Sequence, residues 1–392
     1  PSSIAPSPSS CSSRASTTTG NSFAERWLRF WSNHFTVSIR SLLLTGLVGP
    51  FEREAIRPHV FGNFSTLLRK ATFHQCMLVY LDAAESVGPS TPAAMIRRVG
   101  LNENLAREIM ELHTLGVGSG YSQADIIEFA KALTGWTVAG IRPNLTMANA
   151  TTFRQGRRAK AKSTAPVVQI GKTIFAEDLH EPGARLVLSR RYADTGREQA
   201  PAVLDDLARS KATATHIATK LARHFVSDHP PSTVIDMLAR VFVASGGDLS
   251  ALARAVVDLD EAWGEEQQKF KTPEELAIST IRVAGPQLSF QGGVGQVNSI
   301  YQSLAQTPFR APSPAGWPDD TASWAGPDAV KKRLEWANAV ARRTARVASP
   351  SAMLEMSLGE LASKRTLDTV ARAESAEQGF TLAIMSPEFQ RR

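Results

Sequence analysis

Apolar side chains recur every three or four residues along most of this chain, and this spacing constrains the fold more than any other feature of the sequence. In the segment FAERWLRFWSNHF, Phe23, Trp27 and Trp31 fall on one face of an amphipathic helix. Residues 64–85 show the same spacing, with a break expected near Thr72. Later segments repeat the pattern, so the sequence predicts a mainly α protein, a multi-helix globular bundle.

Helix-terminus signals support this prediction at two places. Ser122 and Asp125 have the spacing of a capping box, and Gly135 suits the end of the helix that they would begin. Thr272 and Glu275 repeat the capping-box spacing around a proline, which is tolerated in the first helical turn. Both segments are therefore expected to be helices with defined starts.

Residues 137–196 differ from the rest, with β-branched runs, turn residues and little helical period. We expect an irregular, partly β insertion there, with TTFR (151–154) and TIFA (173–176) as candidate strands. Residues 1–21 are rich in Ser, Thr and Pro and are expected to form a disordered leader without the apolar core of a signal peptide. Residues 22–392 are expected to form a single large helical domain.

Composition excludes several classes. The 392 residues contain no apolar run long enough for a transmembrane helix, and the two cysteines, Cys11 and Cys76, exclude a disulfide framework. The formal charge is +7, from 44 Lys and Arg against 37 Asp and Glu, but the basic residues are scattered and accompany no nucleic-acid-binding motif. We therefore expect a solvated basic surface, no nucleic-acid partner, and a buried, small-hydrophobe role for Cys76.

Known cofactor and nucleophile motifs are absent. The sequence has no G-x-S-x-G, no phosphate-binding P-loop pattern and no G-x-G-x-x-G that opens a helix after a strand. Nucleotide binding and α/β-hydrolase chemistry are therefore disfavoured, and no cofactor is predicted.

Several motifs occur in one order along the chain. They are FWSNHF (30–35), RPH (57–59), YLD (80–82), NENLAREIMELHTLGV (102–117), ALTGW (132–136), HEPG (180–183), ATATHIATKLARHFV (212–226), FKTPEE (270–275), SPAGWPDD (313–320) and SPEFQRR (386–392). In these blocks the chain resembles the bacterial family called domain of unknown function 1800 (DUF1800), over nearly everything after residue 22.

The resemblance implies a helical, exported bacterial protein, periplasmic or extracellular, often encoded beside an uncharacterised partner. It assigns no catalytic residue. Members usually have histidine where Ser32 stands and lysine where Arg185 stands, and they carry more helical sequence before Phe30. The missing histidine weakens any metal site at that position.

The acidic segment from Asn102 to His113 is the first candidate site. On a helix, Glu103, Arg107 and Glu111 stack four residues apart, while Glu108 lies on the adjoining face. One interpretation is structural: an arginine lies between two carboxylates, and this clamp holds the helix and the following turn. The other takes Glu103, Glu108 and Glu111, with His113, as catalytic, because glycoside hydrolysis needs two carboxylates about 5 to 9 Å apart.

A metal site is a weaker interpretation of the same region. It would combine His34 and His59 with His113, Glu108 and Glu111, but Glu-x-x-Glu followed by Glu-x-His lacks the Glu-x-x-His spacing of a di-iron bundle. We predict no metal ligands, and expect His34, between aromatic residues, to be an interior, hydrogen-bonded histidine.

Three other segments supply candidate substrate-binding residues. His180 and Glu181 precede a Pro-Gly turn in the insertion, where a loop either projects side chains into a cleft or only forms the turn. Trp317 lies beside Asp319 and Asp320, so its ring either stacks on a sugar or anchors local packing.

The segment KLARHF places Lys220, Arg223 and His224 on one helical face. Such a face receives a carboxylate, either from a substrate or from the protein. We expect internal pairing with the acidic helix, and keep Arg223 as a substrate-binding candidate together with His34.

Three functions remain open. The first is an exported hydrolase, with a glycoside hydrolase as the leading type, that acts on a polysaccharide, acidic ones included, through paired glutamates. The second is a non-enzymatic cell-envelope protein that binds a polymer or an envelope partner protein. The third is a metal-dependent oxidoreductase.

Overall fold

The computed structural model of the chain describes residues 20–97, 100–141, 171–264, 267–285, 299–345 and 349–392. Contacts divide the chain into two compact units. Unit 1 consists of residues 1–36, 217–241 and 251–392, and unit 2 consists of residues 37–216 and 242–250. Each unit is described by itself, and the expected single domain over residues 22–392 stays a prediction.

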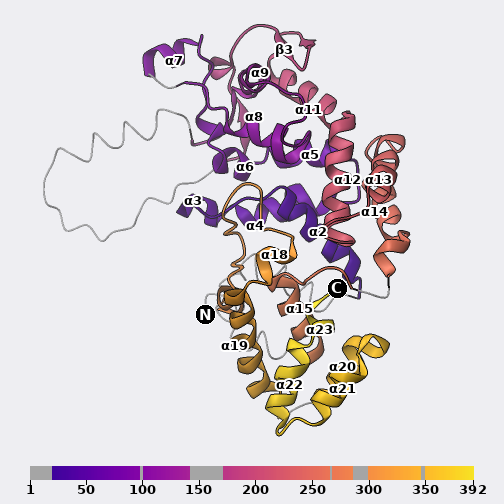
Figure 1. Cartoon of the computed structure of the whole chain (residues 1–392). Helices are drawn as coiled ribbons and strands as arrows, with labels where there is room; N and C mark the ends of the chain where they lie inside the picture. Colours follow the sequence, from indigo (N-terminus) through magenta and orange to yellow (C-terminus); the bar gives the residue numbers. More distant parts are fainter. Residues whose placement is uncertain (1–19, 98–99, 142–170, 265–266, 286–298, 346–348) are drawn as a thin grey trace, which may run out of the picture. The chain divides into compact units, whose positions relative to one another are not determined.

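Unit 2 is built mainly of short helices (Figure 1). In order they are α3 (Leu42–Thr45), α4 (Val48–Pro50), η1 (Phe51–Ile56), η2 (Arg57–His59), α5 (Phe64–Thr72), α6 (Gln75–Tyr80), η3 (Ala83–Glu85), α7 (Pro92–Arg97), α8 (Asn104–Glu108), η4 (Ile109–His113), α9 (Gln123–Leu133), η5 (Glu177–Leu179), η6 (Gly196–Glu198), α11 (Gln199–Arg209) and the first residues of α12 (Lys211–Phe225). The predicted break near Thr72 is confirmed, because α5 ends there and α6 begins at Gln75.

Two small antiparallel sheets lie in the predicted insertion. β1 (Trp136–Val138) pairs with β2 (Thr173–Phe175), and β3 (Arg185–Val187) pairs with β4 (Arg190–Tyr192). The mainly α fold with a partly β insertion is therefore confirmed, and so is the strand predicted at TIFA. The other candidate, TTFR, lies outside the described residues, as does most of the predicted leader.

Unit 1 contains the longest of the described helices, α19 (Pro327–Thr344). Its other helices are α2 (Ser22–His34), the rest of α12, α13 (Ser232–Ala244), α14 (Leu249–Val257), η7 (Asp260–Trp263), α15 (Pro273–Ala284), α18 (Thr321–Trp324), α20 (Pro350–Leu358), η8 (Gly359–Leu361), α21 (Lys364–Ala371), α22 (Ala376–Met385) and α23 (Pro387–Gln390). The last residues of α13 and the first residues of α14, within residues 242–250, belong to unit 2.

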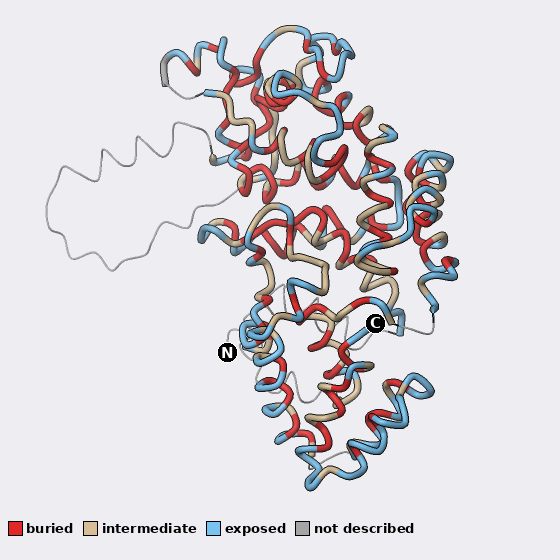
Figure 2. Tube along the Cα trace, viewed as in Figure 1, coloured by how far each residue is buried: buried red, intermediate tan, exposed pale blue. Residues whose placement is uncertain are grey.

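Two apolar groups hold unit 1 together (Figure 2). On α2, Trp27 and Trp31 are fully buried, and the Trp27 ring packs against the ring of Phe225 of α12 at a tilt of 35°, with centroids 5.9 Å apart. Further along the chain, α19 and α22 lie side by side around Trp336 and Phe380. The period of three and four read from the sequence places these side chains on the buried faces.

The end of the chain is tied to the segment before α15. Phe270 and Arg391 form an antiparallel bridge, and Lys269 and Arg392 exchange two backbone hydrogen bonds of 3.2 and 2.9 Å. This short pairing places the Arg392 side chain beside residues 269–275, which is the arrangement that the site below depends on.

The helix-terminus predictions hold. Ser122 with Asp125 and Thr272 with Glu275 both form reciprocal capping boxes. Gly135 follows the end of α9 at a φ of +88°, a conformation that glycine adopts without steric cost. Among the residues that the structure describes, no helix combines the length and apolar character needed to cross a membrane.

Candidate functional site

The polar face of α2 supplies one wall of a pocket in unit 1. The helix starts at Asn21, whose side chain accepts a hydrogen bond from the Ala24 amide, and its aromatic residues occupy the opposite, buried face. Arg26, Arg29 and Asn33 therefore lie together on the outer face, at spacings of three and four. All three line the pocket.

A second wall comes from α12, where Lys220 and His224 are one turn apart and both line the pocket. The backbone carbonyl of His224, in the last turn, accepts hydrogen bonds from the side chains of Arg26 (3.3 Å) and Arg392 (2.6 Å). These bonds satisfy a carbonyl that has no partner within the helix. The end of α12 is thereby fixed to α2 and to the chain terminus.

The third wall is the segment from Ala315 to Asp320. Asn33 holds it by two reciprocal bonds: its Nδ2 donates to the Trp317 carbonyl at 2.9 Å, and its Oδ1 accepts from the Trp317 amide at 2.8 Å. Gly316, at a φ of +89°, permits this approach, because an added Cβ would lie 2.6 Å from Asn33 Oδ1. The Trp317 side chain is half-buried and lines the pocket.

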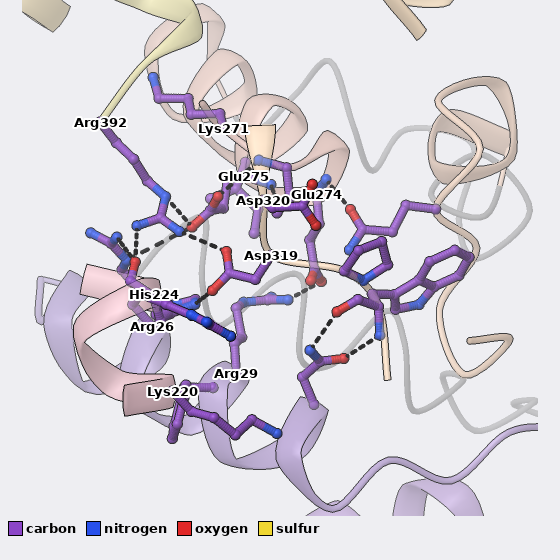
Figure 3. A pocket seen from close by; sticks show the side chains of 18 of the residues that line it. Arg26, Arg29, Lys220, His224, Lys271, Glu274, Glu275, Asp319, Asp320 and Arg392 are labelled. Atoms are coloured by element: carbon purple, nitrogen blue, oxygen red, sulfur yellow. Dashed lines mark hydrogen bonds and ion pairs between the residues drawn. The ribbon is translucent and has the colours of Figure 1, made fainter. Parts of the chain in front are cut away.

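Asp319 is the carboxylate on which the cations of this site converge (Figure 3). Its Oδ2 lies 2.5 Å from His224 Nδ1, and its Oδ1 lies 3.4 Å from Arg392 Nη2 and 3.6 Å from Lys269 Nζ. Burial alone would raise the pKa of Asp319, but His224, Lys269 and Arg26 together lower that pKa below its ordinary value. Asp319 is therefore an anion at neutral pH.

A second aspartate, Asp228, also forms an ion pair with Lys269, whose side chain is only 1% exposed. Lys269 Nζ lies 2.5 Å from Asp228 Oδ1, and the Thr321 amide donates to Asp228 Oδ2 at 2.8 Å. Burial opposes ionisation of Asp228, yet these bonds lower its pKa overall. A buried ammonium is thus held between two carboxylates, as its desolvation requires.

The first turn of α15 supplies the remaining acids. Glu274 pairs with Arg29. Glu275 lies 2.7 Å from Arg392 Nε and 3.7 Å from Arg26 Nε. These glutamates also sit at a helix N-terminus, where the helix dipole favours negative charge.

The pocket enclosed by these walls has a volume of about 790 Å³. Its lining comes from α2, α12, α15, the 315–320 segment and Arg392, all within unit 1. This volume lies in the range of small-molecule sites in proteins.

Two lysines in the pocket are not paired with an opposite charge among the described residues, unlike the carboxylates above. Within the described parts of the chain, Lys220 and Lys271 form no ion pair; Lys271 Nζ instead donates to the Phe389 carbonyl at 2.7 Å. Burial lowers the pKa of each lysine to about 8, against partial opposition from Asp319 for Lys220 and from Glu275 for Lys271. Burial therefore disfavours both ammonium groups, and an added anion would stabilise them.

Four of the residues predicted from sequence lie at this pocket: His34, Arg223, Trp317 and Asp319. His34 is an interior residue, as expected, at 1% exposure and with its ring centroid 4.6 Å from that of Phe35. The internal pairing expected for KLARHF exists, but the partner predicted for it was wrong. His224 pairs with Asp319 because the 315–320 segment, far away in sequence, passes the end of α12.

The acidic segment lies in unit 2, and its Arg107 is clamped as the structural interpretation expects. Arg107 lies 3.2 Å from Glu103 Oε2 and 3.4 Å from Glu111 Oε1, and Gln123 Nε2 donates to Glu103 at 2.6 Å. The helix itself differs from the prediction, since α8 ends at Glu108 and continues as the π-helical turn η4. Wider turns of this kind shift the side chains that follow away from α-helical positions.

Glu108 and His113 lie off that clamp. The pKa of the half-buried Glu108 is raised, first by burial and then by the negative charge of Glu111. His113 is buried in η4 at 2% exposure. Glu108 thus combines partial burial with a raised pKa.

The HEPG segment turns its side chains inward. His180 Nδ1 lies 2.8 Å from the Thr134 carbonyl, and Glu181 accepts hydrogen bonds of 2.7 Å each from the Ser90 amide and hydroxyl. His180 and Glu181 are only 8% and 6% exposed. Of the two roles left open for this loop, the turn-forming one is observed, because its polar groups are used to fix the turn; the substrate-binding role predicted for His180 and Glu181 is corrected.

The described residues contain no group of three or more His, Cys, Asp or Glu side chains placed to hold a metal ion. Cys76 is fully buried, as predicted.

Sequence reasoning missed much of the pocket: Arg26, Arg29, Asn33, Asp228, Lys271, Glu274, Glu275 and Arg392. The signal on α2 was present, because three polar residues fall on the face opposite the tryptophans. Nothing in the sequence pairs that face with residues 269–275 or with the last residue of the chain, since those contacts span more than two hundred positions.

Comparison with known families gives one match. The family model described as "Protein of unknown function (DUF1800)" matches residues 9–391. Searches of curated proteins and of solved structures found no match.

Proposed function

The chain belongs to the DUF1800 family, and we propose that it acts on an acidic polysaccharide whose anionic sugar residues bind in the pocket of unit 1. The family description names no reaction, so the proposal rests on the chain's own residues. It keeps the substrate class expected from the sequence and places its binding in the pocket.

The observation that carries the proposal is the pair of under-compensated lysines. Lys220 and Lys271 line one pocket, and burial holds the pKa of each at about 8. The carboxylates nearby are already occupied: Asp319 by His224 and Lys269, and Glu275 by Arg392. A ligand carboxylate would supply the missing counter-charge, and charge-assisted hydrogen bonds of this kind are among the strong ones.

The rest of the lining suits a sugar. The half-buried ring of Trp317 offers an aromatic surface on which a pyranose can stack, next to polar groups that bond hydroxyls. Its backbone is held on both sides by Asn33, so the ring is positioned before a ligand arrives.

Affinity measurements on the purified full chain test the proposal. Isothermal titration with oligomers of polygalacturonate and of alginate should show binding, whereas a neutral dextran oligomer should not bind. Lys271→Met should weaken binding about ten- to a hundredfold, because a charged hydrogen bond contributes roughly 1.5 to 3 kcal/mol.

Lys364→Met is the matched control, since Lys364 is an exposed lysine of α21 outside the pocket. Equal affinity for charged and neutral oligomers, or equal effects of the two substitutions, would contradict the proposal.

A second candidate is hydrolysis by the glutamates of unit 2. The raised pKa of Glu108 beside Glu111 favours it, because a general acid must remain protonated at the working pH. Glu108→Gln should then abolish release of reducing ends, whereas Glu360→Gln, at an exposed position of η8, should not. Full activity of Glu108→Gln would remove this candidate.

Binding without cleavage would make the protein an envelope-binding protein, and export to the periplasm or the cell exterior fits either role. Recovery of the chain with the wall fraction of its native host, released by added polyuronate, would support that location. Recovery only with the cytosol would contradict it.

A further inference from the structure

Five carboxylates that line the pocket are engaged by cations or by an N–H group. Asp228, Asp319, Glu274 and Glu275 are each within an ion pair, and Asp320 caps α18 by accepting from the Ser323 amide at 2.8 Å. Cations and N–H groups lower the pKa of Asp228 and Asp319 despite their burial. Hydrolysis by two carboxyl groups requires one that stays protonated, and the lowered pKa values of Asp228 and Asp319 favour their anions.

Lys220 has the opposite character. Its side chain lies in the pocket on α12, one turn before His224, and it forms neither an ion pair nor a hydrogen bond within the described residues. A desolvated lysine amine is a base that functions near neutral pH. Its pKa of about 8 leaves a substantial neutral fraction in mildly alkaline solution.

Lys271 and Arg223 line the same pocket, and neither forms an ion pair within the described chain. The Arg223 guanidinium keeps its charge at a pH where Lys220 is neutral, whereas burial lowers the pKa of Lys271 to about 8 as well. A cation beside a sugar carboxylate neutralises its charge, which makes the C–H bond next to that carboxylate more acidic. The pocket thus combines a base with groups that activate such a bond.

We propose that this pocket cleaves a uronic-acid-containing polysaccharide by β-elimination, with the Lys220 amine as the base. The inference rests on the proposed function for its substrate class, and adds the reaction and the residue.

The step balances without water or an oxidant. The neutral Lys220 amine removes the proton on the carbon next to the carboxylate, and the electron pair of that C–H bond forms a C=C bond to the neighbouring ring carbon. The bond from that carbon to the glycosidic oxygen breaks, and the Lys220 ammonium returns the proton to this oxygen. The products are one chain with a new hydroxyl group and one with an unsaturated uronate end.

The test uses the purified full chain with polygalacturonate and, separately, alginate. The conjugated C=C bond absorbs ultraviolet light, so elimination is followed by absorbance while total cleavage is followed by reducing ends. The two should rise together. Lys220→Met and Lys220→Arg should each lower kcat at least a thousandfold while leaving binding of the same polymers within about tenfold, since both remove the base and the arginine keeps the charge.

Lys211→Met, at an exposed lysine in the first turn of α12, is the matched control and should keep full activity. Unfolding curves of all variants establish that they are folded. For the native chain, kcat should rise with pH as Lys220 loses its proton, and Lys211→Met should show the same profile.

Reducing ends without ultraviolet absorbance would overturn elimination in favour of hydrolysis. Binding of the polymers without any cleavage would overturn it too, and would leave the proposed binding function standing. Absorbance that persists in folded Lys220→Arg would overturn the assignment of the base. Failure to bind either polymer would sink the proposed function itself.

Discussion

Asn33 and Trp317 lie 284 positions apart, and each donates one hydrogen bond to the other. The Asn33 amide replaces the backbone partner that a strand would provide, so an irregular segment acquires a fixed position beside α2. This contact fixes where Trp317 and the nearby Asp319 lie, so Asn33 is a positioning residue for the pocket.

Asn33→Ala should lower the free energy of unfolding by about 2 kcal/mol, because two hydrogen bonds are lost and their buried partners stay unsatisfied. Urea unfolding measures this. The control is Asn338→Ala, an exposed asparagine of α19 with one side-chain bond to Thr381, which should change stability by less than about 0.5 kcal/mol. Similar losses for both variants would show that the reciprocal pair has no special role.

Gly316→Ala should destabilise unit 1 by about 2 kcal/mol or more. The new Cβ would approach Asn33 Oδ1 to 2.6 Å at a φ of +89°, so steric conflict and backbone strain add. Gly264→Ala is matched to it, because the exposed Gly264 has a φ of −58° and no atom within 4 Å of an added Cβ. Thermal unfolding should show a large drop in Tm for the first variant and almost none for the second.

Asp319→Asn should cost about 3 kcal/mol at pH 7, because it leaves His224, Lys269 and Arg392 around a neutral group. The lowered pKa of Asp319 determines how its contribution to stability changes with pH. The carboxylate stabilises the fold fully above its unfolded pKa of about 3.9, and this contribution is lost as pH falls through the lower folded value.

The difference in unfolding free energy between the native chain and Asp319→Asn should therefore shrink below about pH 3.9. Asp320→Asn serves as control, since asparagine also caps a helix and α18 keeps its cap. A pH-independent difference would contradict the role of the Asp319 charge.

Binding of polyuronates should weaken as pH rises through about 8, where Lys271 loses its proton. Below that pH its ammonium group is present, and a bound carboxylate should raise the pKa of Lys271 and take up protons. Titration calorimetry in buffers of different ionisation enthalpy measures this uptake. Unchanged affinity from pH 7 to pH 10 would exclude the lysines as the anion site.

Local sequence predicted the elements that depend on neighbouring residues. The apolar face of α2, the break at Thr72, both capping boxes and the strand at TIFA follow from spacings of two to four residues, and the structure confirms each. The Glu103–Arg107–Glu111 clamp was predictable for the same reason, as a repeat of four on one helix.

Predictions that depended on distant partners succeeded less well. The sequence left open whether His180 and Glu181 enter a cleft or only form a turn, and their contacts with Thr134 and Ser90 show that they form the turn. His224 was expected to pair internally, and it does, although with Asp319.

The sequence by itself determined a mainly α protein, its family, and where several helices begin and end, because helix signals act over a few residues. Only the tertiary structure decided that α2, α12, the segment before α15, the 315–320 segment and Arg392 enclose one pocket. It also decided which cations of the pocket form an ion pair with a carboxylate and which do not. Ion pairing and desolvation depend on distances in space, and those follow from how the whole chain packs.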